Sequence, residues 1–306
     1  MQKPQWSRLG WVLLPLLGAC GPAEEVSPES SSLYGQSQAL AVTNGLAFNG
    51  LAFNGLAFNG LAFNGLAFNG LHSAEFHAWF QEEPALRHML MSYMVQCAVP
   101  SGQTRTYTNP KTGITYTWQG NLGLATDWAS GKPSTVKEQQ VVSACLAAHG
   151  NKYGVHIPIS VLGRSATAVA IPYTTSELTT FSEREGCFFG NLFNNEGLYA
   201  VSDAPPLHVE ESTARGCALS TTKDATSQEC QPLIRLPDNC GKFCIQDASK
   251  KFYASCTYNG VTYQPLTTRI RPEEIYTCGD GTCQLTEKCG TGTLAESCKS
   301  DCGVCS

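Results

Sequence analysis

Apolar residues recur with helical spacing in three stretches before the middle of the chain. The longest has apolar residues at positions i, i+4, i+7, i+8 and i+11, which are Leu86, Leu90, Tyr93, Met94 and Cys97. This period puts them on one face of a helix that Pro84 can open. Ser73 can cap a shorter helix, and Thr135 with Glu138 forms a capping box at the start of a third. We therefore predict three amphipathic helices.

Other segments show the alternation that is typical of β-strands. Residues 104–108 and 114–118 alternate around the turn-forming stretch 109–113, which predicts a hairpin. We also predict strands over 155–161 and 167–171, and a helix over about 176–185. The core is expected to include Phe188, Phe189, Leu192 and Phe193, and residues 198–275 are expected to be short strands and loops crossed by cysteines. The fold class that follows is α+β, with one disulfide-rich globular domain over 72–275.

The N-terminus has the layout of an export signal. Lys3 and Arg8 precede a nine-residue apolar run, 9–17, which is too short to span a bilayer. Leu17-Gly18-Ala19-Cys20 follows and resembles the lipobox of bacterial lipoproteins, although an ordinary signal that happens to end at a cysteine is the alternative. The resemblance implies cleavage after residue 19 and lipid attachment, including palmitate, at Cys20. Gly21 in place of Asp favours the outer membrane in that family.

Residues 20–43 are small and polar, and are expected to form a tether. The motif Asn-Gly-Leu-Ala-Phe then occurs five times over residues 44–68, and Asn69-Gly70-Leu71 begins a sixth copy. A period of five matches neither a helix nor a strand, and each Asn-Gly favours a turn. We interpret 44–71 as a flexible spacer, with a short β-solenoid or a self-associating segment as the alternative.

The chain has 15 cysteines, and Cys20 leaves an even number for disulfides. Residues 276–306 hold six of them in a segment too small to build a core, so we predict a separate module held by its own disulfides. Within the main domain, Cys97 and Cys145 lie near helix ends and are the first predicted pair. The candidates for disulfides are Cys97, Cys145, Cys187, Cys217, Cys230, Cys240, Cys244, Cys256, Cys278, Cys283, Cys289, Cys298, Cys302 and Cys305.

The composition of the chain limits the classes of function that it can have. The net charge is −5, and removal of residues 1–19 leaves 18 basic against 25 acidic residues, a net charge of −7. This balance argues against nucleic acid as a partner. Abundant cysteine argues for an oxidising compartment, where thiolates become disulfides rather than zinc ligands. We therefore interpret Cys302 and Cys305, a C-x-x-C pair, as structural. Asp280, Glu287 and Asp301 lack the spacing of a calcium loop.

Several patterns suggest catalysis, and each has a structural explanation. The S-x-x-K match at 134–137 and the K-T-G match at 111–113 occur in the wrong order for a penicillin-recognising enzyme, and a helix start and a turn account for them. His149 with Cys187 is a candidate thiol-hydrolase pair. The candidate glycosidase carboxylates are Asp127, Glu183 and Glu185, and the candidate sugar platform is Tyr116, Trp118 and Trp128. We assign no catalytic residue, metal site or cofactor.

The complete layout resembles uncharacterised lipoproteins of myxobacterial type. The resemblance rests on the lipobox, the Asn-Gly-Leu repeats, the stretches 142–146 and 185–193, and the cysteine-rich end. It implies location and class, and brings no activity. The expected function is a lipid-anchored envelope component that binds or supports other envelope parts, with the membrane and an envelope polysaccharide or protein as partners. The alternative is an envelope hydrolase acting on polysaccharide or peptide.

Overall fold

The computed structural model describes residues 41–44, 46–47, 71–151, 157–194, 196–203, 233–275, 278–279, 281, 283, 287–294 and 297–305. These residues form a mixture of helices and strands. The helices are α4 (Ala74–Glu82), α5 (Pro84–Ala98), α6 (Thr126–Ala129), α7 (Val136–His149), α8 (Thr175–Thr180), α10 (Cys240–Phe243), α11 (Lys299–Cys302) and the 3-10 helix η3 (Pro272–Glu274). The strands of the main part are β1 (Ala41–Asn44), β2 (Leu46–Ala47), β3 (Thr104–Thr108), β4 (Thr115–Gln119), β5 (Gly150–Asn151), β6 (Ile157–Gly163), β7 (Glu183–Asn191), β8 (Gly197–Ser202), β9 (Leu233–Arg235), β10 (Cys244–Gln246), β11 (Tyr253–Tyr258), β12 (Val261–Tyr263) and β13 (Leu266–Ile270).

The three predicted helix starts are confirmed. Ser73 Oγ accepts a hydrogen bond from the backbone N–H of Phe76 at 3.1 Å and so caps α4. Pro84 is the first residue of α5. At α7, Thr135 Oγ1 accepts from the N–H of Glu138 at 3.2 Å, and the Glu138 carboxylate accepts from the N–H of Thr135 at 2.9 Å. The helix starts therefore follow from signals within three residues of each cap.

Strands β3 and β4 form the predicted hairpin. One further prediction was correct only in its first half, and another was wrong. The helix expected over 176–185 ends at Thr180, and β7 begins at Glu183, because β7 pairs with both β8 and β13 and this pairing overrides local propensity. Residues 167–171 form a tight turn instead of a strand. The N–H of Ser165 donates to the carbonyl of Val169 at 2.7 Å, and Ala168 has a left-handed φ of 66°.

A six-stranded sheet with the order β1-β6-β13-β7-β8-β9 organises the main domain. Neighbouring strands are antiparallel except β8 and β9, which are parallel. Strand β7 is buried along most of its length, as expected of a strand covered on both faces. Alternate residues of β7 and β8 therefore enter two different cores.

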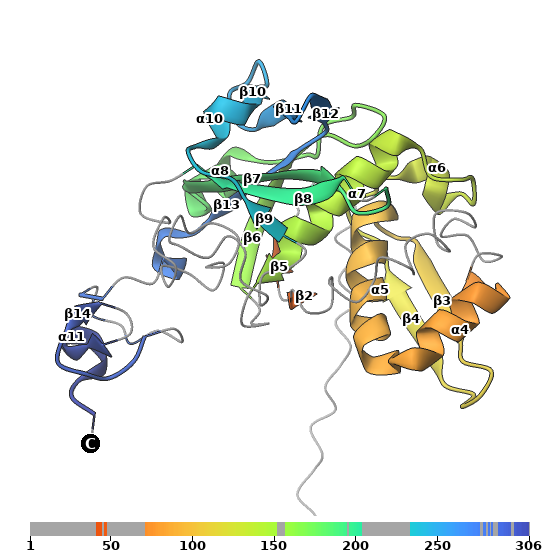
Figure 1. Ribbon diagram of the computed structural model, residues 1–306, viewed down its shortest axis with the longest axis horizontal. Helices are drawn as coiled ribbons and strands as arrows, with labels where there is room; N and C mark the ends of the chain where they lie inside the picture. The colour runs from red at the N-terminus through yellow and green to blue at the C-terminus, as the bar shows by residue number, and fades with distance from the viewer. Residues whose placement is uncertain are drawn as a thin grey trace, which may run out of the picture. The chain divides into compact units, whose positions relative to one another are not determined.

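One core lies between the sheet and helices α5 and α7. It contains Phe188, Leu198 and Ala200 from the sheet, together with the buried faces of α4, α5 and α7. The other core lies on the opposite face, beneath the three-stranded sheet β10-β11-β12, and contains Cys187, Phe189, Tyr199 and Val201 from β7 and β8. In Figure 1 the α5 and α7 helices and the β10–β12 sheet lie on different sides of the central strands.

The sheet begins before residue 72, where the sequence predicted the domain to start. Strand β1 pairs antiparallel with β6, with Ala41 opposite Ser160. Strand β2 pairs parallel with β5. The segments predicted as tether and repeat therefore both contribute backbone pairing to the domain, through residues 41–44 and 46–47.

The cysteine-rich end contains β14 (Thr293–Leu294), β15 (Ser297–Cys298) and α11. Its six cysteines pair among themselves, as predicted, with the connectivity Cys278–Cys298, Cys283–Cys302 and Cys289–Cys305. In the order of the chain, the first cysteine bonds to the fourth, the second to the fifth and the third to the sixth. The C-x-x-C cysteines are thus bonded to other partners and not to each other.

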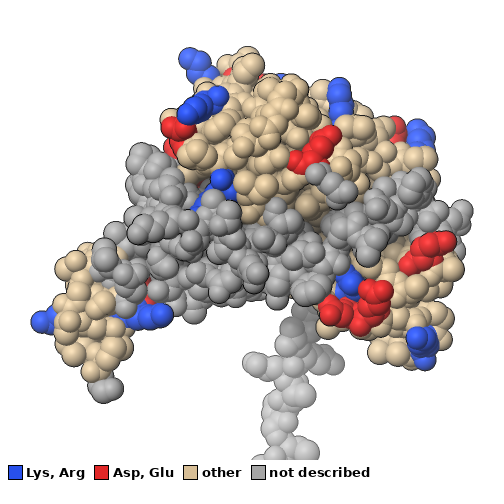
Figure 2. Space-filling model, viewed as in Figure 1, with Lys and Arg blue, Asp and Glu red and all other residues tan. Residues whose placement is uncertain are grey.

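Charged side chains are sparse on the surface that Figure 2 shows, where basic and acidic groups lie singly or in small mixed groups. Within the part of the chain that the structure describes, no helix is both long and apolar enough to cross a bilayer. Residues 1–40, which include Cys20 and the apolar run 9–17, lie outside the described residues, as do Cys217 and Cys230.

Candidate functional site

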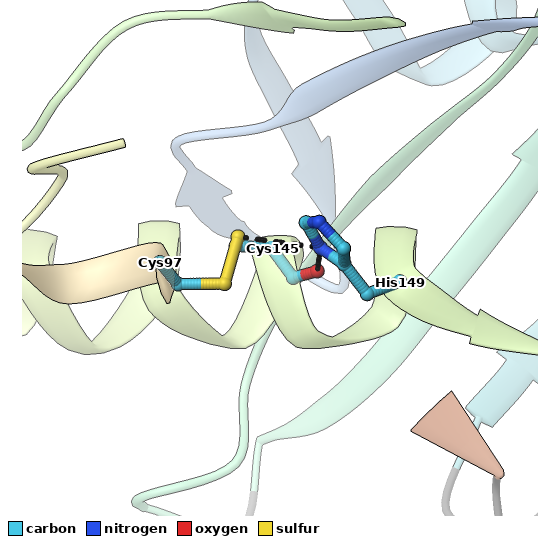
Figure 3. Close-up of side chains that lie close together, drawn as sticks. All are labelled: Cys97, Cys145 and His149. Carbon is cyan, nitrogen blue, oxygen red and sulfur yellow. Dashed lines mark hydrogen bonds between the residues drawn. A yellow bond between two sulfur atoms is a disulfide. The ribbon is translucent and has the colours of Figure 1, made fainter. Parts of the chain in front are cut away.

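Two helices of the first core are joined by the predicted disulfide between Cys97 and Cys145, with an S–S distance of 2.03 Å. His149 lies one turn after Cys145 on α7, and Figure 3 shows its ring beside the disulfide. Its Nδ1 is 2.8 Å from the carbonyl oxygen of Cys145 and 3.6 Å from the Cys145 sulfur. Because a carbonyl oxygen only accepts, Nδ1 must carry the proton in this hydrogen bond.

This Cys97–Cys145–His149 cluster is fully buried. The ring of Tyr93 lies 5.5 Å from that of His149, and burial raises the pKa of Tyr93. The sulfurs are oxidised, so neither offers the thiolate that nucleophilic attack or metal binding needs. The cluster therefore functions as a covalent connection between α5 and α7.

The proposed pair of His149 with Cys187 is not brought together. His149 contacts the first core through Tyr93 and Cys145, whereas Cys187 belongs to the second core, on the opposite face of the sheet. Cys187 is also bonded to Cys240. A thiol-hydrolase mechanism through this pair would need a free thiolate within reach of the imidazole, so this candidate is wrong.

The candidate carboxylates are engaged separately. Asp127 on α6 forms an ion pair with Lys132 at 2.9 Å. Glu185, which is fully buried in β7, accepts a hydrogen bond from Thr268 Oγ1 at 2.6 Å. Glu183 accepts from the hydroxyl of Ser182 at 3.4 Å. Asp127 lies on α6, whereas Glu183 and Glu185 lie two residues apart on β7, and each of the three is engaged with a different neighbour.

The candidate aromatic platform is part of the core. Trp128 is fully buried, and Trp118 is 2% exposed. The Nε1–H of Trp118 donates to His88 Nδ1 at 2.9 Å. Tyr116 stacks on Trp118 with ring centres 6.3 Å apart. The rings of Tyr116 and Trp118 stabilise the contact between the β3–β4 hairpin and helices α4 and α5. Trp128 instead packs edge-on against Phe193, with ring centres 5.6 Å apart, so the three rings do not form one flat surface for a sugar.

Sequence reasoning missed an ionic cluster at the edge of the second core. Arg184 forms an ion pair with Asp203, and its guanidinium carbon lies 5.3 Å from the centre of the Tyr253 ring. The Tyr253 hydroxyl donates to both Asp203 oxygens, at 3.0 and 3.1 Å. Burial, followed by the charge of Asp203, raises the pKa of Tyr253 to about 12. Burial, followed by repulsion from Arg184, lowers the pKa of Arg269. Sequence spacing offers no signal for this cluster, because its members come from four separate strands or strand ends.

A second group of sulfurs lies in the core beneath β10–β12. Cys187 is bonded to Cys240, and Cys244 is bonded to Cys256 directly opposite it on β11. The two disulfides touch, with 3.6 Å between the sulfurs of Cys187 and Cys244.

One concave surface is a groove of about 300 Å³ between three segments of the chain. The residues that line it share one property, the absence of charge, and are Pro100, Ser101, Asn121, Leu122, Gly123, Leu124, Thr126, Ser165, Thr167, Val169, Ala170, Ile171 and Pro172. Hydroxyl and amide groups lie among apolar ones, a combination suited to binding an uncharged polar ligand. The turn that replaced the predicted strand at 167–171 forms one wall.

In the cysteine-rich end, two of the three acidic residues considered for calcium contact other groups of the module. Asp301 accepts hydrogen bonds from the backbone N–H groups of Gly279 and Gly281, at 2.6 and 3.3 Å. Glu287 is buried, with a carboxylate oxygen 3.8 Å from the Cys302 sulfur. Asp280 lies outside the described residues. The Asp301 carboxylate thus supports the loop around Cys278.

The chain was compared with protein-family models, with curated proteins and with solved structures, and it matches none of them.

Proposed function

We propose that the protein is an exported lipoprotein, anchored to the cell envelope through a lipid on Cys20, with a disulfide-stabilised domain and a separate cysteine-rich module. One observation carries the proposal. All twelve cysteines within the described residues are in disulfides. Disulfides form and persist in oxidising compartments, and reducing systems keep most cytosolic thiols free. An exported protein is therefore the class that this bonding supports.

Cys20 fits a different role from the other cysteines. It follows a short apolar run and small residues, the arrangement of a lipobox. With twelve cysteines paired and Cys217 and Cys230 able to form one more disulfide, Cys20 is the odd residue. A single acyl chain anchors a protein weakly, and two or more anchor it stably. A diacylglyceryl group with an added acyl chain on Cys20 would therefore hold the protein at a membrane.

The anchor is tested by expressing the full chain and a Cys20→Ser variant in a Gram-negative host supplied with an alkyne-tagged fatty acid. We expect the full chain to be labelled and to sediment with the membranes, and the variant to be unlabelled and released. A Cys97→Ser/Cys145→Ser variant is the matched control, because it loses two cysteines and keeps the lipobox. Label or membrane retention in the Cys20→Ser variant would exclude lipidation at this residue.

We infer that the domain binds or supports other envelope components. The candidate catalytic groups make contacts that stabilise the fold. The groove defined above is instead open to solvent, and none of its lining residues carries a charge. Its hydroxyl, amide and apolar groups suit a neutral stretch of envelope polysaccharide.

A Thr126→Trp variant tests this role, because residue 126 is exposed and lines the groove. We expect the wild-type protein to co-sediment with insoluble envelope polysaccharide and the variant to remain in solution. A Val136→Trp variant places the same bulk on an exposed residue that is absent from the groove lining, and should co-sediment. Release of soluble sugar by the wild-type protein would point to hydrolysis instead, and equal sedimentation of all three would exclude the groove.

A further inference from the structure

The two touching disulfides beneath β10–β12 bring four sulfurs from distant parts of the chain together. Cys187 lies on β7, Cys240 begins α10, Cys244 begins β10, and Cys256 lies on β11. The sulfurs of Cys187 and Cys244 are 3.6 Å apart, and those of Cys187, Cys244 and Cys256 all lie within 4.8 Å of one another. A separation of 3.6 Å is van der Waals contact between two sulfur atoms, so a sulfur of one disulfide already lies at the distance from which it can attack the other.

Access to the four sulfurs is unequal. Cys187, Cys240 and Cys256 are fully buried, whereas Cys244 is 7% exposed. Cys244 lies on β10, an edge strand of its three-stranded sheet, and the next residue, Ile245, is 72% exposed. Cys244 is thus the one residue of the four that solvent touches, so a reductant from solution reaches the Cys244–Cys256 bond first, from the side of Cys244.

We propose that Cys244–Cys256 is an exchangeable disulfide whose reduction by a dithiol is passed on to Cys187–Cys240 through the Cys187–Cys244 contact. A thiolate of the dithiol attacks the Cys244 sulfur, the Cys244–Cys256 bond breaks, and Cys256 leaves as a thiolate. The second thiol of the dithiol then displaces Cys244, so the dithiol leaves as a disulfide and two electrons have entered the protein.

The next step occurs within the protein and needs no further reductant. The Cys244 thiolate attacks the Cys187 sulfur, the Cys187–Cys244 bond forms, the Cys187–Cys240 bond breaks, and Cys240 leaves as a thiolate that takes up a proton. The product has one disulfide, Cys187–Cys244, and thiols at Cys240 and Cys256. The new bond joins the central sheet to the edge strand β10 directly, and the covalent links of α10 to β7 and of β10 to β11 are lost.

Tryptic peptides make the exchange measurable, because each of the four cysteines falls in its own peptide: 185–215, 236–242, 243–250 and 252–269. The folded mature protein is treated with one equivalent of dithiothreitol, quenched in acid, alkylated, digested and mapped without reduction. We expect a disulfide-linked pair of the peptides 185–215 and 243–250, with alkylation at Cys240 exceeding that at Cys244. Alkylation of Cys244 and Cys256 with Cys187–Cys240 intact at all times would overturn the proposal, and so would resistance of all four cysteines until the protein unfolds.

Variants separate the transfer from the initial reduction. Cys187→Ser/Cys240→Ser removes the acceptor disulfide, so the same treatment should alkylate Cys244 and Cys256 equally. Cys97→Ser/Cys145→Ser removes a buried disulfide of the other core and should leave the Cys187–Cys244 product unchanged. The map of the wild-type protein decides the proposal even where the first variant does not fold. The outcome is independent of lipid attachment, since the chemistry involves none of residues 1–40.

Discussion

The Glu138 side chain connects the start of α7 to the start of α6 through hydrogen bonds, and its replacement by Ala tests how much these bonds contribute to stability. The side chain is 2% exposed. One carboxylate oxygen accepts from the backbone N–H groups of Asp127 and Trp128, at 2.9 and 3.0 Å. The other accepts from the N–H and hydroxyl of Thr135, at 2.9 and 3.1 Å. Glu138 thus fixes the start of α7 and the start of α6 together, beside the groove residue Thr126.

The expected cost follows from these bonds. Loss of a helix cap costs about 1 kcal/mol, and each buried N–H left without an acceptor costs about 1–3 kcal/mol. With the N–H groups of Asp127 and Trp128 both affected, we expect Glu138→Ala to lower the free energy of unfolding by about 3–7 kcal/mol. Glu138→Gln keeps the size and one acceptor oxygen, so its loss should fall between those of the wild type and the Ala variant.

The assay is urea unfolding of the mature chain with its disulfides intact, followed by tryptophan fluorescence. Glu75→Ala is the matched control, because Glu75 is an exposed acid in the first turn of α4 and its loss should cost about 0.3–1 kcal/mol through the helix dipole. If Glu138→Ala and Glu75→Ala lower the midpoint equally, with unchanged slopes, the hydrogen bonds of Glu138 do not carry the stability assigned to them.

Three further predictions use other parts of the fold. Cys97→Ser/Cys145→Ser opens a loop of 48 residues and should cost about 4 kcal/mol in urea unfolding, and a loss below about 1 kcal/mol would contradict the role of this disulfide. Gly190→Ala puts a Cβ 2.3 Å from a carbonyl oxygen of β8 at a φ of +136°, and should lower the free energy of unfolding by about 3 kcal/mol. The control Gly102→Ala, at a φ of +80° with open space around the Cβ, should lower it by about 1 kcal/mol, and equal losses of stability would refute the clash. Burial raises the pKa of Tyr253 from 10.0 to about 12, so the folded state binds this proton more tightly than the unfolded state and loses stability as the pH rises from 10 to about 12. Tyr253→Phe should lose less stability over this range. An absorbance titration of phenolate should show one fewer group ionising near pH 12 in the variant than in the wild type.

Features encoded by neighbouring residues were predictable from the sequence. The caps of α4 and α7 and the β3–β4 turn each depend on groups that are within about five residues of one another. The Cys97–Cys145 disulfide was also predictable from the sequence, because two amphipathic helices with a cysteine near the end of each must pack their apolar faces together. In these cases the local preference and the tertiary structure agree.

The rest depended on contacts between distant residues. The sulfurs of Cys187 and Cys244 are 57 residues apart in sequence, and nothing in their spacing indicates contact. Pairing of β1 with β6 is a backbone interaction at the edge of a sheet, so it leaves little trace in the side-chain pattern of residues 41–44. The groove was missed for the same reason, since the turn that forms one wall alternates like a strand.

The order of the disulfides in the cysteine-rich end has a consequence for proteolysis. The three closed loops, 278–298, 283–302 and 289–305, overlap in sequence, so every peptide bond between Cys278 and Cys305 lies inside at least one of them. A protease that cuts this segment once therefore releases nothing, because a disulfide still joins the two pieces. A nicked molecule therefore keeps its module attached to the domain until the disulfides are reduced.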